Sequence, residues 1–123
     1  MTHYIARCTS DYHSYVRHVY VDKRLDRMPF AQAGVITRKG VTQLVSYETI
    51  VAEIDDGWLH VYGLFSNTTR KHIGAFLKEY APRLFYADAR ACYENDVEIN
   101  IETRETRDAA LCQAHTIGLR HAI

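Results

Sequence analysis

The pattern of apolar and polar positions in residues 49–65 alternates with a period of two. Ile50, Ala52 and Ile54 would share one face of an extended strand, which is typical of a strand with one buried side. Asp56-Gly57 in the middle of the segment is a strong two-residue turn signal. The pattern therefore predicts a β-hairpin.

Two further segments predict strands. Residues 33–47 contain two short extended pieces with Lys39-Gly40 as the pivot between them. Residues 97–102 alternate Val and Ile with Glu and Asn, as expected for a strand with one wet face.

After residue 65 the spacing of apolar residues changes to that of a helix. Ser66 or Asn67 is a good N-cap, and Pro82 predicts the end, because the residue before a proline avoids helical backbone angles. The spacing i, i+3, i+4, i+7 places one apolar stripe on Ile73, Phe76, Leu77 and Tyr80.

Two more helices are predicted towards the C-terminus. The first covers residues 84–95, with inward positions Phe85, Ala89, Cys92 and Tyr93. The second covers residues 106–123, where Thr106 would cap the helix and Asp108 would suit the positive end of its dipole.

Residues 1–28 fit either a helix or a strand. Tyr12, Tyr15, Val16 and Val19 follow a helical stripe, whereas the same β-branched and aromatic composition suits a strand. We predict a helix over residues 10–27, with a strand as the alternative. Because strands and helices come in runs, residues 1–123 predict a single α+β domain, a small antiparallel sheet with helices packed on one face.

Composition narrows the function classes. The chain of 123 residues is 47% hydrophobic and carries no net charge, so it is not the strongly basic domain typical of nucleic-acid binding. The charge is uneven, since residues 1–40 hold seven Lys and Arg against three Asp and Glu. No apolar run approaches the roughly 20 residues of a membrane span. With no secretory signal and three widely spaced cysteines, we expect reduced thiols and a location in the cytosol of the cell that makes the protein, with no membrane partner.

The segment "SNTTRKH" (residues 66–72) is the strongest candidate for a binding site. Free N–H groups at a helix start, together with hydroxyl and basic side chains, favour an anion or an acidic partner surface. The alternative is an ordinary helix cap with solvated cations. The candidate residues are Thr68, Thr69, Arg70, Lys71, His72 and Lys78.

No catalytic or metal constellation is predicted. Cys112, His115 and His121 would bring only two good ligands together, and a closed zinc site needs four. His60 is interpreted as a sheet-face residue. Asp55 and Asp56 suit a turn for backbone reasons, so we predict neither an enzyme nor a cofactor. Nine tyrosines, several near basic residues in the N-terminal segment, favour half-buried packing or an interface, including that of a homodimer.

Residues 45–102 carry string motifs that resemble a known family. The strings are "SYETIVA", "YGLFS", "TTRKHIGAFLKEYAP" and "ACYE". They resemble small proteins of bacterial phages, plasmids and conjugative elements that have no known activity. The resemblance implies an accessory protein of a mobile element, and anti-CRISPR inhibitors are one such class.

The leading prediction is therefore a non-enzymatic inhibitor of a host defence complex, such as a CRISPR effector, acting by protein–protein contact. The acidic stretch 94–108 would face a basic channel, while Arg70 and Lys71 would engage an acidic patch. The alternative is a regulatory nucleic-acid-binding protein of a phage or plasmid, whose Thr and Lys/Arg side chains touch phosphates.

Overall fold

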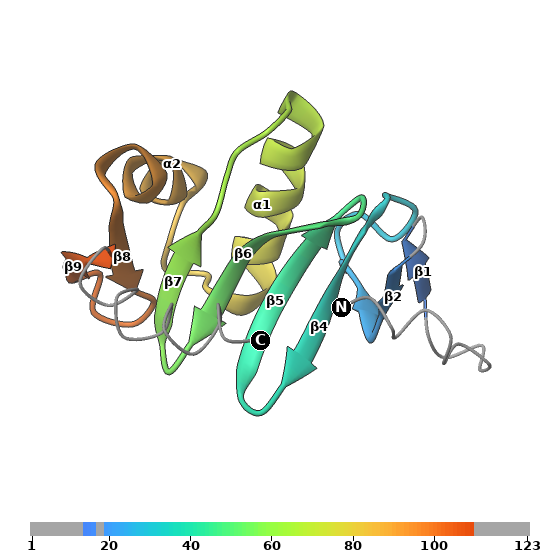
Figure 1. The fold of residues 1–123 in the computed structure, drawn as a ribbon, viewed down its shortest axis with the longest axis horizontal. Helices are drawn as coiled ribbons and strands as arrows, with labels where there is room; N and C mark the ends of the chain where they lie inside the picture. The colour runs from blue at the N-terminus through green and yellow to red at the C-terminus, as the bar shows by residue number, and fades with distance from the viewer. Residues whose placement is uncertain (1–13, 17–18, 110–123) are drawn as a thin grey trace, which may run out of the picture.

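The computed structural model describes residues 14–16 and 19–109 of the chain (Figure 1). In chain order the elements are β1 Ser14–Val16, β2 Val19–Val21, β3 Lys23–Arg24, β4 Ala33–Arg38, β5 Val41–Ser46, β6 Thr49–Asp55, β7 Trp58–Val61, α1 Asn67–Tyr80, α2 Tyr86–Asn95, β8 Val97–Asn100 and β9 Thr106–Asp108. β1 and β2 form a two-stranded sheet. β3 to β9 form a seven-stranded sheet in which every neighbouring pair is antiparallel. The predicted α+β class is confirmed.

Both predicted hairpins form at their predicted turns. Lys39 and Gly40 have φ of 50° and 82°, and Asp56 and Gly57 have φ of 53° and 81°. Two successive left-handed residues make the kind of tight turn whose twist matches that of paired strands. Local turn chemistry therefore fixes the register of β4 on β5 and of β6 on β7.

Helix α1 begins and ends as predicted. The Ser66 hydroxyl accepts a hydrogen bond from the Thr69 N–H at 3.1 Å. After the helix, the Ala81 N–H donates to the Leu77 carbonyl at 2.8 Å, just before Pro82. Sequence signals at both ends are thus sufficient to place this element.

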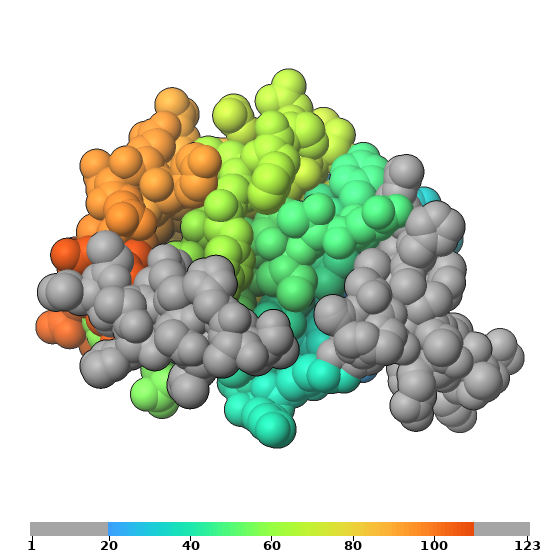
Figure 2. Space-filling view, in the orientation of Figure 1, coloured from blue at the N-terminus to red at the C-terminus, as the bar shows by residue number. Residues whose placement is uncertain are grey.

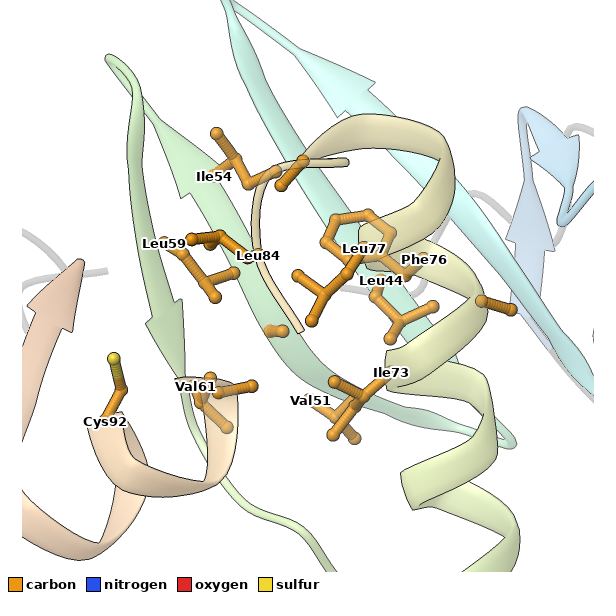
Figure 3. Packing of buried hydrophobic residues seen from close by; sticks show 14 of the residues in the cluster. Leu44, Val51, Ile54, Leu59, Val61, Ile73, Phe76, Leu77, Leu84 and Cys92 are labelled. Atoms are coloured by element: carbon orange, nitrogen blue, oxygen red, sulfur yellow. The ribbon is translucent and has the colours of Figure 1, made fainter. Parts of the chain in front are cut away.

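The core lies between one face of the large sheet and the two helices. Ile73, Phe76 and Leu77 of α1 are buried against Leu44 and Leu59 of the strands, with Cys92 of α2 at the edge of the same cluster (Figure 3). Ala52 and Ile99 of the strands and Ala89 of α2 belong to this cluster too. α1 and α2 lie side by side over this face (Figures 1 and 2). On the opposite face, Val21, Ile36 and Val45 form a small second cluster.

Two helix predictions are wrong within the described residues. Residues 14–16, 19–21 and 23–24 form strands rather than a helix. The β-branched and aromatic side chains of β1 and β2 suit the extended backbone in which these strands pair with each other, and β3 pairs with β4. Residues 106–108 form β9 instead of a helix start, since pairing with β8 satisfies their backbone groups. The rest of the predicted C-terminal helix lies outside the described residues.

Three predicted inward positions are also wrong. Phe85 and Tyr93 are 63% and 47% exposed, because α2 touches the sheet mainly through Ala89 and Cys92. Ile50 is 39% exposed. An irregularity in the pairing of β5 with β6 at Leu44 and Val45 breaks the alternation, so Val51 is buried instead.

No helix of the described part of the chain combines the length and the apolarity that crossing a membrane would require.

Candidate binding site: a basic groove beside helix α1

The six residues predicted to bind an anion or a partner separate into two groups. Thr68, Arg70, Lys71 and Lys78 are exposed, whereas Thr69 and His72 are buried, at 3% and 1% exposure. Thr69 and His72 precede Ile73 and Phe76 on the same helical stripe, at spacings that turn all four towards the sheet.

Thr69 and His72 are used inside the protein. The Ser46 hydroxyl at the end of β5 hydrogen-bonds His72 Nδ1 at 2.8 Å and Thr69 Oγ1 at 3.1 Å. The ring of Tyr47 lies 5.8 Å from that of His72. Burial lowers the pKa of His72 from its ordinary value, which favours the neutral ring. This network joins the start of α1 to β5, so neither residue presents its side chain at the surface.

Lys71 and Lys78 instead line a groove of about 370 Å³ beside α1. The other cation on its wall is Arg27, from the segment between β3 and β4. The remaining lining residues are Met28, Gly74, Ala75, Leu84, Phe85 and Tyr86. The exposed Arg70 is not among the lining residues, so the predicted pair of adjacent cations is divided between two surfaces.

The charge of the groove is not balanced locally. Among the described residues, no Asp or Glu lines it, and none of its three cations forms an ion pair with a residue in 19–109. This leaves three positive charges around one hollow, which attracts anions.

The carboxylates that neighbour the groove in sequence are engaged elsewhere. Asp26 and Glu79 both pair with Lys23, and their hydrogen bonds raise the pKa of Lys23 above its ordinary value. Asp88 accepts two hydrogen bonds of 3.0 Å from Arg104 and caps α2 through the Phe85 N–H at 2.7 Å. The nearby negative charges are thus neutralised, and the positive field of the groove is not.

Three residues that line the groove have features that are uncommon in folded proteins. Phe85 is 63% exposed. The buried hydroxyl of Tyr86 has no hydrogen-bond partner in the described part of the chain. Gly74 stands in the middle of α1, where a Cβ would meet no atom within 4 Å. Phe85 and Gly74 together give the groove an apolar floor with free space, and the unpartnered Tyr86 hydroxyl lies buried behind its surface.

A family model matches residues 24–93, more than half of the chain, and its description is a family of unknown function, DUF8033. The chain belongs to DUF8033. Every lining residue of the groove falls inside the matched segment, so the groove lies wholly within the part that defines DUF8033. A search of curated proteins and a search of solved structures found no match. The DUF8033 match names no phage, plasmid or anti-CRISPR protein, so the predicted link to mobile elements stays a prediction.

A second polar cluster crosses the face of the DUF8033 sheet opposite the helices. Strand register aligns Gln43, Glu53 and His60 on β5, β6 and β7, with Gln43 Nε2 donating to Glu53 at 3.1 Å. His60 Nδ1 lies 3.2 Å from Glu98, and Arg107 donates to the same carboxylate at 2.8 and 2.9 Å. His60 is therefore a sheet-face residue, as predicted.

The charges of this cluster are matched. Burial alone would raise the pKa of Glu98, but hydrogen bonds from His60 and Arg107 outweigh it and hold the pKa below its ordinary value. The Arg107 guanidinium also stacks 4.1 Å from the Trp58 ring. Of the acidic stretch 94–108 predicted to meet a partner, Glu98 is thus buried and paired, and Glu94 and Glu102 are exposed but paired with Arg90 and Arg83. The remaining carboxylates of the stretch, Asp96, Glu105 and Asp108, are exposed.

Other candidate chemistry is limited in the described residues. No group of three or more His, Cys, Asp or Glu within 14–16 and 19–109 is placed to hold a metal ion. Cys92 is buried, which raises the pKa of its thiol to about 11 and keeps it protonated at neutral pH. Cys112, His115 and His121, for which the sequence predicts no zinc site, lie outside the described residues.

Proposed function

We propose that this DUF8033 protein is a non-enzymatic binding protein that holds a polyanion in the groove beside α1. The observation that supports the proposal is the set of three cations, Arg27, Lys71 and Lys78, around one hollow with no lining carboxylate among the described residues. Like charges that share a surface repel one another unless a counter-charge binds between them.

The spacing of the cations suits a chain of negative charges better than a single ion. Lys71 and Lys78 are seven residues apart on α1, so their Cα atoms are separated by about 10 Å along the helix axis. Arg27 reaches the same groove from another element. A chain of negative charges can contact all three cations without drawing the cations together, which a single small anion would require.

The direct test is binding of inorganic polyphosphate of defined length, measured by titration calorimetry at several salt concentrations. A single-stranded polyanion that contacts three cations releases counterions with a slope of log K against log salt of about −2. We expect that slope for the native protein. We expect it to approach zero for the triple variant Arg27→Ala, Lys71→Ala, Lys78→Ala.

The matched control is the double variant Lys39→Ala, Arg70→Ala, which removes exposed cations outside the groove. Arg70 is on the same helix as Lys71, so this control separates the groove from the helix start predicted from the sequence. Native-like binding by the groove triple variant, or no polyphosphate binding by the native protein, would contradict the proposal.

Inhibition of a host defence complex remains the wider prediction for this protein. It rests on the resemblance to mobile-element proteins, and in that case the groove would hold an acidic segment of the complex. The test is nuclease activity of several purified CRISPR effectors with the protein in large molar excess. Unchanged cleavage by every effector would remove this prediction without affecting the polyanion proposal.

A further inference from the structure

Gly74 is the feature of the groove that the fold itself does not explain. Glycine destabilises a helix interior relative to alanine, and proteins usually place it there for a close contact. Here a Cβ on Gly74 would meet no atom within 4 Å, so no neighbouring element requires the missing side chain. What the glycine does leave is free space in the groove floor between Lys71 and Lys78.

Two aromatic residues border that space. Phe85 presents a ring that is 63% exposed, although apolar side chains are more stable when covered. Tyr86 lines the same groove with a buried hydroxyl that has no partner in residues 19–109, and such groups are normally hydrogen-bonded. A ligand with a planar ring would cover the ring of Phe85, and it would lie beside Tyr86, which lines the same groove.

We propose that the groove binds a single strand of nucleic acid, with one base above Gly74 and against Phe85 and with neighbouring phosphates on Arg27, Lys71 and Lys78. This inference rests on the proposed polyanion function and names its ligand class. Cations that follow a backbone, interleaved with an aromatic platform, are the usual means of binding unpaired strands. In a duplex the bases are stacked inside the helix and cannot reach the groove floor.

An acidic peptide is the competing ligand. Its carboxylates would suit the three cations equally well. Asp and Glu side chains bring no ring to cover Phe85 and need no free space above Gly74. The apolar floor therefore favours a nucleobase over a run of carboxylates, and the two ligands are separated in the test.

The test measures fluorescence anisotropy with four labelled probes: a ten-residue oligothymidine, the same strand with abasic sites throughout, a ten-base-pair duplex and a ten-residue polyglutamate. We expect the oligothymidine to bind most tightly. Phe85→Ala should weaken oligothymidine by about 5- to 150-fold, the loss of one stacked base, and leave the abasic strand unchanged. Phe30→Ala is the matched control, since Phe30 is 95% exposed and is not a lining residue.

A second variant tests the space itself. Gly74→Leu should fill the groove floor and weaken oligothymidine at least as much as Phe85→Ala does. A Cβ at this position meets no atom within 4 Å, and thermal melting checks that the variant is folded. Thr68→Leu, an exposed position of α1 outside the groove, should bind as the native protein does.

The outcomes separate the inference from the function on which it rests. Equal binding of the abasic strand and oligothymidine, or native-like binding by a folded Gly74→Leu variant, overturns the inference and leaves the polyanion function standing. Tighter binding of polyglutamate or duplex also overturns it. Failure of every probe, polyphosphate included, overturns both.

Discussion

Replacing Gly74 with alanine should stabilise this protein. Gly74 lies in the interior of α1, where glycine is about 0.8–1.0 kcal/mol less favourable than alanine. Nothing within 4 Å opposes the added Cβ, and the backbone is helical, so the full propensity difference should appear. Unfolding entropy of about 2.1 cal/mol/K per residue then gives a rise in melting temperature of about 3–4 °C for a chain of this length.

Gly40 supplies a matched control of opposite sign. A Cβ on Gly40 would also meet no atom within 4 Å, but its φ is +82°. An alanine there must adopt a left-handed conformation, which is unfavourable by about 1–2 kcal/mol. Gly40→Ala should therefore lower the melting temperature, although the space around the two glycines is alike.

Differential scanning calorimetry of the native protein and the two variants at one pH and one salt concentration measures both shifts. Reversibility of each scan must be checked first, because a melting temperature reports stability only then. An unchanged or lower melting temperature for Gly74→Ala would refute the argument that this glycine is free of packing constraints. A rise for Gly40→Ala would refute the argument from backbone conformation.

Three further predictions concern stability and are measured as urea midpoints. Burial lowers the pKa of His72, so the unfolded chain takes up this proton more readily. The stabilisation is complete above the unfolded pKa of about 6.5 and is lost as the pH falls below it; His72→Gln should flatten that part of the profile, and an unchanged slope would contradict the assignment. Glu98→Gln should destabilise by about 2 kcal/mol because it weakens a mostly buried pair, whereas Glu94→Gln, in an exposed pair, should change stability by less than about 0.5 kcal/mol; equal effects would show that burial does not decide. Phe76→Ala should destabilise by about 3–5 kcal/mol and Phe85→Ala by less than about 0.5 kcal/mol, since only the first ring is in the core; a large loss for Phe85 would remove it as a surface platform.

Short-range signals predicted the elements that depend on local chemistry. Asp56-Gly57 and Lys39-Gly40 gave both hairpins, because two left-handed residues leave few alternatives to a tight turn. Ser66 and Pro82 gave the ends of α1 for similar reasons. The fold class followed from the order of these elements.

Predictions failed where tertiary packing decides. Residues 19–24 have a composition that suits a helix or a strand, and pairing of Lys23 and Arg24 with β4 decides between them. The inward face of α2 depends on where the helix meets the sheet, and Tyr93 is consequently exposed. One available signal was missed. Thr69 and His72 extend the apolar stripe of α1, and that spacing already indicated burial.

The groove could not be predicted from the sequence because the residues that line it are far apart along the chain. Arg27, Lys71 and Phe85 come from three different segments, and no local pattern indicates that they meet. The sequence did predict Lys71 and Lys78 as binding residues, and Gly74 was a further signal, since an isolated glycine inside an amphipathic helix lowers its stability. The sequence could indicate that the helix contains an unfavourable glycine, but not which residues of other segments lie next to that glycine.

The two polar clusters of this protein differ in a way that bears on function. On the sheet face, Glu98 is buried but matched by His60 and Arg107, so the cluster contributes to the fold and leaves no group in need of a ligand. At the groove, three cations and the Tyr86 hydroxyl have no partner within the described residues, and the ring of Phe85 is exposed; each of these features is mildly unfavourable. In proteins that fold well, charges are paired, apolar rings are covered and buried hydroxyls are hydrogen-bonded at nearly every position. Places where several of these conditions fail together tend to be functional. The cations and the exposed ring have independent physical causes and still line one hollow, so a shared ligand accounts for them more simply than separate accidents do.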